Sequence, residues 1–210
     1  MHSAIRRTSI AALCAAALVA ACSKSEKNTD SARMADSAAM AAPAPAGSSS
    51  TTTSAAPALT DANIVAMVDE ANMADSSSGN VAATKGTNAE VKTFGRDMMR
   101  DHHALRKMGQ DLAKKLNVTP QMPPNDSSTA RDKAWVDSLN SMPKGTSWDK
   151  AYIDHEVAAH QQVLSTLHTA EGAAQNAELK SLITKAIPTI ESHLKKAQDI
   201  QSKLQSAKTS

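Results

Sequence analysis

Apolar residues recur every three or four positions in four long segments, about residues 60–85, 88–116, 147–171 and 177–206. This spacing places the apolar side chains on one face of an α-helix, and strand-like alternation is absent. A shorter helical segment, residues 127–141, follows the run TPQMPPND, and we expect Asp126 or Ser127 to cap it. The pattern therefore predicts an all-α domain over residues 59–206.

The connections between the four long segments are short, long and short, and the long one carries the shorter helical segment. This order is typical of a ferritin-like four-helix bundle, in which one long crossover joins two antiparallel helix pairs. A plain up-down-up-down bundle is the alternative. Pro188 lies inside the fourth segment, so we expect either a kink or a late helix start there.

The first 58 residues show a different composition. Residues 1–21 have the layout of a secretory signal, with Arg6 and Arg7 followed by an apolar run. The run ends in Val-Ala-Ala-Cys, which resembles the bacterial lipobox, so we expect a lipoprotein signal peptide and an acylated Cys22. An ordinary secretory signal with an incidental cysteine is the alternative. Residues 22–58 contain no leucine, isoleucine or aromatic residue, which predicts a disordered linker.

These features exclude several classes of function. Cys14 would leave with the signal peptide and lipid would block Cys22, so no thiol would remain for a disulfide or a nucleophile. Removal of Arg6 and Arg7 leaves equal numbers of basic and acidic residues, and only 2% of the residues are aromatic. Nucleic acid is therefore not an expected partner. The expected partner is a membrane, through the lipid anchor.

Each long segment places one polar residue on its apolar face near its midpoint. On helical wheels these residues are Asp75, His102, His160 and His193, and Glu156 lies beside His160. His103 points about 100° away from its neighbour and faces outward. Two antiparallel pairs with short turns bring such midpoints to a similar depth, so we expect these side chains to converge inside the bundle.

Buried polar groups must be satisfied, because an unsatisfied one costs about 1 to 3 kcal/mol. One solution is a hydrogen-bonded cluster in which Asp75, Glu156 and water pair with the imidazoles. The other is a metal ion, for which three neutral imidazoles and a carboxylate suit zinc, copper or iron. Both remain open at the level of sequence.

Other metal motifs fail on spacing. The run HEVAAH, residues 155–160, turns its two histidines about 140° apart on a helix, so it is not the zinc-protease motif HExxH. The Glu-x-x-His pairs of di-iron bundles are also missing, since the residues three before the inward histidines are Met99, Val157 and Ile190. Copper ligation by methionine is a weaker alternative, because methionines at helical spacing usually fill cores. The candidates are Met98, Met99 and Met108.

Three stretches carry a family resemblance: MMRDHHALRKMGQDLAKKLNVT, WDKAYIDHEVAAHQQVLSTL and LKSLITKAIPTIESHLKKAQ, in that order. Over about residues 60–201 the chain resembles the bacterial family called domain of unknown function 4142. The resemblance implies a ferritin-like helical bundle, often described as an outer-membrane or exported protein. It also implies that the family's recurrent histidines are His102, His160 and His193. The family commonly carries glutamates in the first helix, where this chain offers Asp75 and then Ser77, which shortens or removes acidic ligands.

We therefore expect a lipid-anchored protein of the bacterial cell envelope, held at the outer membrane and facing the periplasm. Its ferritin-like domain would be a non-enzymatic binding or stress-related module, with the inner histidine and aspartate cluster as a candidate site for one metal ion. A metal-dependent oxidoreductase or metal-handling enzyme is the first alternative, and it would need an open coordination position. A purely structural envelope protein is the second.

Overall fold

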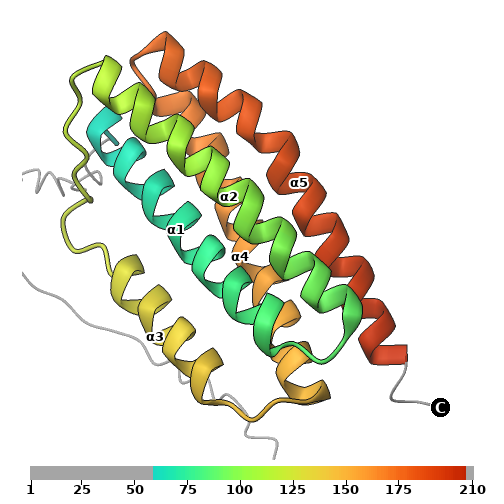
Figure 1. Ribbon diagram of the computed structural model, residues 1–210. Helices are drawn as coiled ribbons and strands as arrows, with labels where there is room; N and C mark the ends of the chain where they lie inside the picture. Colours follow the sequence, from blue (N-terminus) through green and yellow to red (C-terminus); the bar gives the residue numbers. More distant parts are fainter. Residues whose placement is uncertain (1–58, 207–210) are drawn as a thin grey trace, which may run out of the picture. The chain divides into compact units, whose positions relative to one another are not determined.

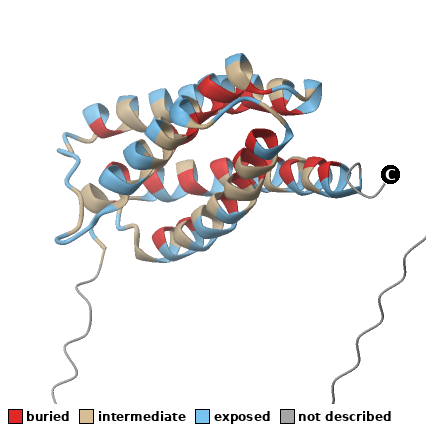
Figure 2. Ribbon diagram, turned by 90° about the horizontal axis from the view of Figure 1, so that it is seen from below, coloured by how far each residue is buried: buried red, intermediate tan, exposed pale blue. Residues whose placement is uncertain are grey.

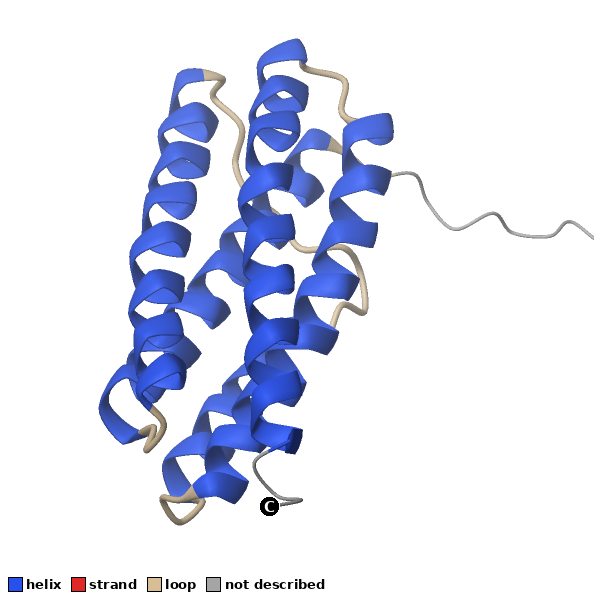
Figure 3. Ribbon diagram, turned by 90° about the vertical axis from the view of Figure 1, so that its right-hand side faces the viewer, coloured by secondary structure: helices blue, strands red, loops and turns tan. Residues whose placement is uncertain are grey.

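The computed structural model describes residues 59–206, which form five helices and no strand (Figures 1 and 3). The prediction of an all-α domain is confirmed, and every helix begins and ends within about two residues of its predicted segment. The helices are α1 (Asp61–Lys85), α2 (Ala89–Lys115), α3 (Ser128–Ser141), α4 (Thr146–Ala173) and α5 (Ala177–Ser206). The predicted signal peptide, lipidated Cys22 and linker lie outside the described residues.

None of the five described helices combines the length and the apolarity that a bilayer-spanning segment requires. The helices pack as two hairpins, α1 on α2 and α4 on α5, and further contacts join α2 to α5 and α1 to α4. The long crossover brings α3 alongside α1 (Figure 1). The helices α1 and α2 approach closely at Gly79 and Gly95, where a Cβ on either glycine would lie 2.7 Å from the carbonyl oxygen of the other.

Two aspartates tie the hairpins together at opposite ends. The Asp61 carboxylate of α1 accepts hydrogen bonds from the backbone N–H groups of Gln175 and Asn176, in the turn between α4 and α5. The Asp149 carboxylate of α4 accepts the equivalent bonds from the N–H groups of Thr87 and Asn88, in the turn between α1 and α2. Each hairpin thus supplies the aspartate that caps the turn of the other hairpin.

The same reciprocity holds for ion pairs on the surface. Lys115 of α2 pairs with Glu178 of α5, and Lys203 of α5 pairs with Glu90 of α2. In both kinds of contact, equivalent residues of the two hairpins are 88 positions apart in the sequence, as Asp61 and Asp149 are. The sequence NAEVKT at residue 88 likewise returns as NAELKS at residue 176. The domain is therefore an approximate twofold repeat of one helical hairpin, because each contact recurs with the two hairpins exchanged.

Buried residues recur along the facing sides of the helices (Figure 2) and form two apolar clusters. One cluster lies toward the turn between α1 and α2 and contains Phe94, Met98, Trp148 and Tyr152. The other lies toward the turn between α4 and α5 and contains Ile64, Leu167, Leu179 and Ile183. Apart from Asp149, which lies beside Trp148 at the end of the first cluster, the buried polar residues lie between the two clusters in sequence on every long helix, so a polar layer divides the core.

The structure tests two local predictions, the capping residue of α3 and the start of α5. The side chain of Asp126 accepts the N–H of Ser128 at 2.8 Å and so supplies the side-chain cap at the start of α3, where Ser127 makes no such bond. Helix α5 begins at Ala177 and runs through Pro188, so the late helix start offered as one alternative does not occur.

Candidate metal centre

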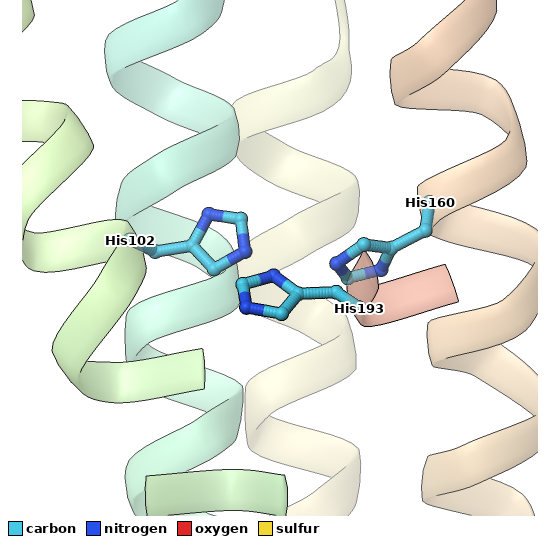
Figure 4. A group of neighbouring side chains, drawn as sticks. All are labelled: His102, His160 and His193. Atoms are coloured by element: carbon cyan, nitrogen blue, oxygen red, sulfur yellow. The ribbon is translucent and has the colours of Figure 1, made fainter. Parts of the chain in front are cut away.

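Three imidazole rings from three helices meet in the polar layer (Figure 4). His102 lies on α2, His160 on α4 and His193 on α5, with exposed fractions of 1%, 0% and 5%. Their ring centroids lie between 5.1 and 5.6 Å apart. One nitrogen of each ring lies within 4.8 Å of the corresponding nitrogens of the other two rings. The convergence that the helical wheels predicted for these three histidines is present.

A hydrogen bond on the outer side of each ring fixes its orientation. His102 Nδ1 lies 2.9 Å from Asn72 Oδ1, and the Asn72 amide is itself oriented because its Nδ2 donates to the carbonyl of Val68. His160 Nδ1 lies 2.9 Å from the carbonyl oxygen of Glu156. His193 Nε2 lies 3.0 Å from Asp101 Oδ2. Because all three partners are acceptors, each of these nitrogens carries the ring's proton.

In the neutral form of each ring, the remaining nitrogen is an unprotonated acceptor. These atoms, His102 Nε2, His160 Nε2 and His193 Nδ1, are buried and have no hydrogen-bond partner. Burial and the two neighbouring imidazoles hold the pKa of His102 well below its usual value. Burial and the charge of His193 lower the pKa of His160 to about 4. The rings of His102 and His160 are thus neutral near pH 7, as metal ligation requires.

Two carboxyl groups lie beside the histidines and form a second group with His160, within 4.8 Å of one another. Asp75 Oδ2 is 3.6 Å from His102 Nδ1, the nitrogen that faces Asn72, and so lies on the outer side of that ring. Glu156 Oε1 accepts the hydroxyl of Ser78 at 3.0 Å, and Oε2 lies 3.5 Å from His160 Nδ1. The structure therefore brings the predicted residues together as two overlapping groups that share His160.

Burial favours the neutral form of both carboxyl groups. Burial raises the pKa of Asp75 to about 7, with a smaller contribution from the charge of Asp132. Burial and the nearby Asp75 raise the pKa of Glu156 well above its usual value. Among residues 59–206 neither carboxyl forms an ion pair with a lysine or arginine. A cation bound in this layer would supply the missing positive charge and favour ionised carboxylates.

The sequence reasoning missed the residues that orient the rings. Asn72 lies three positions before Asp75 and therefore on the same helical face, so a wheel that tracked amides as well as charges would have found it. Asp101 directly precedes His102 and points away from it, yet it reaches His193 on another helix. No spacing within one helix signals such a contact. The hydroxyl of Ser78 was also missed, although it follows Asp75 by three positions.

A family model described as "Domain of unknown function (DUF4142)" matches residues 46–200. The chain belongs to this family. No curated protein and no solved structure matches the sequence. Membership in DUF4142 confirms the resemblance seen in the three histidine-bearing stretches, but it assigns no reaction and no ligand. The function of this DUF4142 domain must be argued from the chemistry of its polar layer.

In their neutral forms, three imidazoles whose free nitrogens face one another form a common ligand set for zinc, copper and iron. The outer acceptors are also the kind of partner that metal-bound histidines have, a carboxylate, a backbone carbonyl or a side-chain amide oxygen. Direct ligation at about 2.0 to 2.1 Å requires the nitrogens to move closer together than 4.8 Å.

Proposed function

We propose that this DUF4142 domain binds one transition metal ion through His102 Nε2, His160 Nε2 and His193 Nδ1. The observation that supports this most strongly is the set of three buried acceptors that face one another with no donor between them. Their protons are already committed to outer partners. An ion with vacant orbitals is the partner that can accept three lone pairs at once.

The structural alternative, in which the histidines only hydrogen-bond, leaves part of this set unsatisfied. One water molecule donates at most two hydrogen bonds, so it cannot pair with three acceptors. A buried acceptor left over would cost about 1 to 3 kcal/mol. In the metal-bound state all three nitrogens have a partner, and for that reason we prefer the metal site to the hydrogen-bonded cluster.

Zinc, copper and iron remain the candidate ions, because imidazole ligands suit all three. Asp75 and Glu156 belong to the proposed site as the carboxylates that balance the charge of the ion, and either one would complete the ligand set after rotating toward it. Copper ligation by methionine receives no support from burial, since Met98 packs in an apolar cluster and Met99 and Met108 are exposed. We propose no catalytic step for the site.

We further propose that the domain is a ferritin-like four-helix bundle on a lipid-anchored protein of the cell envelope, at the outer membrane and facing the periplasm. The support is the lipobox-like Val-Ala-Ala-Cys at residues 19–22 and the linker composition that follows it. Replacing Cys22 with serine should abolish incorporation of a radioactive fatty acid. Persistent labelling of the variant would refute lipidation at that residue.

Elemental analysis of the purified protein tests the metal site. We expect one transition metal ion per chain in the wild type, and loss of that ion in the variants His102→Ala, His160→Ala and His193→Ala. His103→Ala is the matched control, because His103 is the next residue on the same helix and is exposed. Equal metal content in His102→Ala and His103→Ala, or a wild type that takes up no metal, would overturn the proposal.

A further inference from the structure

A cavity of about 660 Å³ lies between α1, α3 and α4. Its walls are largely apolar and include Met67, Ala71, Leu105, Ala159, Val163 and Ile190. The volume is far larger than one ion needs, and it falls in the range of about 300 to 1,000 Å³ that is typical of sites for small organic molecules. The cavity reaches Asp75 and His102 but not His160 or His193.

The charged groups around this cavity are mostly carboxyls. Glu70, Asp75, Asp126 and Asp132 line it. Burial raises the pKa of Glu70 and the charge of Asp132 raises it further, so these two carboxyls lie close enough to repel each other. Arg131 also lines the cavity, but its side chain is 67% exposed and contacts Asp132 from the solvent side. The cavity therefore presents a negative potential to any ligand that enters it.

The wall formed by α3 and α4 carries an aromatic pair. The rings of Trp135 and His155 stack with centroids 4.0 Å apart, and both residues line the cavity. Burial lowers the pKa of His155, so its ring adds no positive charge near pH 7. The indole Nε1–H of Trp135 is buried and has no acceptor among the described residues.

We propose that this cavity binds a small amphipathic amine, with its apolar body against the aliphatic and aromatic walls and its ammonium group toward Glu70 and Asp132. The apolar walls select for a hydrophobic body, and the carboxylates of Glu70 and Asp132 select for a positive charge. An aromatic wall also attracts cations through the negative face of its ring. The amine site is distinct from the three-histidine site and does not depend on metal there.

Titration calorimetry with three probes of the same apolar body tests the charge selection. The probes are 4-phenylbutylamine, 4-phenylbutanol and 4-phenylbutyrate, which are a cation, a neutral molecule and an anion at pH 7.5. The protein is the chain from residue 22 onward with Cys22→Ser, treated with a chelator so that no metal ion is bound beside the cavity. We expect the amine to bind most tightly, the alcohol more weakly and the carboxylate weakest or not at all.

Two substitutions locate the binding. Asp132→Asn should weaken binding of the amine by about fivefold while leaving binding of the alcohol nearly unchanged, because one partly buried charge pair contributes about 1 kcal/mol. Asp137→Asn is the matched control on the same helix, since Asp137 pairs with Lys133 and does not line the cavity. Ala159→Phe should weaken binding of all three probes by filling the space.

The proposal fails if the carboxylate binds as tightly as the amine, or if none of the three probes binds. It also fails if Asp132→Asn and Asp137→Asn alter amine binding equally, because the charge effect would then be general rather than local. Circular dichroism of each variant shows whether the fold is retained. A metal-binding protein that takes up no amine contradicts this inference alone, and an amine-binding protein without metal contradicts the metal proposal alone.

Discussion

Asp101 is the residue on which the orientation of His193 depends. Its carboxylate holds His193 Nε2–H at 3.0 Å and leaves Nδ1 free to face the other two rings. Arg100 and His193 keep the pKa of Asp101 below its usual value, so the group is ionised at neutral pH. The structure therefore assigns Asp101 the part of a positioning residue for the proposed metal centre.

We predict that Asp101→Ala lowers the affinity for metal by about 10- to 100-fold, the usual effect of removing an outer partner of a histidine ligand. The matched control is Asp97→Ala, one helical turn earlier on α2. Asp97 also pairs with Arg100, but its other partner is Lys196 rather than a histidine. Competition titrations with a chromophoric chelator measure the affinities. Equal losses in the two variants would mean that surface charge, rather than ring orientation, sets the affinity.

Asp75 gives the metal-free domain a pH-dependent stability. Its pKa is about 7 in the folded state against 3.8 for the ordinary group, so the folded state holds the proton more tightly than the unfolded state does. The stability from this group is complete below pH 3.8 and is lost as the pH rises through about 7. His160 acts in the opposite direction, because its lowered pKa takes stability away as the pH falls from 6.5 toward 4.

Asparagine at position 75 cannot ionise, so Asp75→Asn should remove the loss of folding stability that the wild type shows as the pH rises. We predict that the metal-free variant gains more than about 1 kcal/mol of unfolding free energy relative to wild type between pH 5 and pH 8. Urea unfolding at the two pH values, with a chelator present, measures the difference. A difference between variant and wild type that does not change with pH would contradict the argument from burial.

The sequence allowed the inward residues to be predicted but not their partners. Helical periodicity determines which face a side chain occupies, and this was enough to select His102 over His103. The partners depend on how the helices are rotated and shifted against one another, which no single helix determines. For that reason Asn72 and Asp101 went unnoticed, and the wheels did not show that Asp75 lies on the outer side of the His102 ring.

At the scale of helices, α1 and α2 depend on two glycines. A Cβ on Gly79 would lie 2.7 Å from the carbonyl oxygen of Gly95 and 2.9 Å from Met98 Cβ. A Cβ on Gly95 would lie 2.8 Å from Ala82 Cβ. Backbone and Cβ atoms cannot rotate away, so a side chain at either position must push the helices apart.

We predict that Gly79→Ala and Gly95→Ala each lower the unfolding free energy by about 1 to 3 kcal/mol, the usual cost of overpacking. Gly109→Ala is the matched control on α2, because a Cβ there meets nothing within 4 Å. It should raise the stability by up to about 1 kcal/mol, since alanine favours the helix. Thermal unfolding compares the three variants. An equal loss of stability in all three variants would contradict the close approach of α1 and α2 as the cause, because a Cβ at Gly109 meets nothing.

Helix bounds were predictable because they depend on local chemistry. Asn88 accepts the N–H groups of Glu90 and Val91, and Asn176 accepts those of Glu178 and Leu179, so each second helix starts at an asparagine that the sequence displays. The twofold repeat was equally present in the sequence as NAEVKT and NAELKS, but it went unnoticed. Two short matches 88 residues apart gain meaning only when the structure shows their equivalent contacts.

For the whole molecule, the proposed site breaks the twofold relation. The position equivalent to His160 carries Asn72, the position equivalent to His102 carries Ile190, and the position equivalent to His193 carries Leu105. The contacts of the two aspartates with the turns and the two Lys–Glu ion pairs follow the twofold relation, whereas the residues of the polar layer do not. The two hairpins thus serve one common fold and contribute differently to a single asymmetric site.

Metal binding should stabilise the whole domain, because an ion that binds only the folded state shifts the unfolding equilibrium. At about a thousandfold excess over the dissociation constant the gain is about 4 kcal/mol. We predict a rise in melting temperature on addition of the bound metal to wild type and to His103→Ala, and none for His160→Ala. Differential scanning fluorimetry measures the melting temperatures of the three proteins with and without metal. Equal shifts in the three proteins would indicate metal at other residues.

Anomalous diffraction from crystals of the metal-loaded domain tests the central claim most directly. The account predicts one anomalous peak between His102 Nε2, His160 Nε2 and His193 Nδ1, within about 2.3 Å of all three nitrogens. Peaks confined to the surface, or a site that engages only one of the three rings, would contradict it.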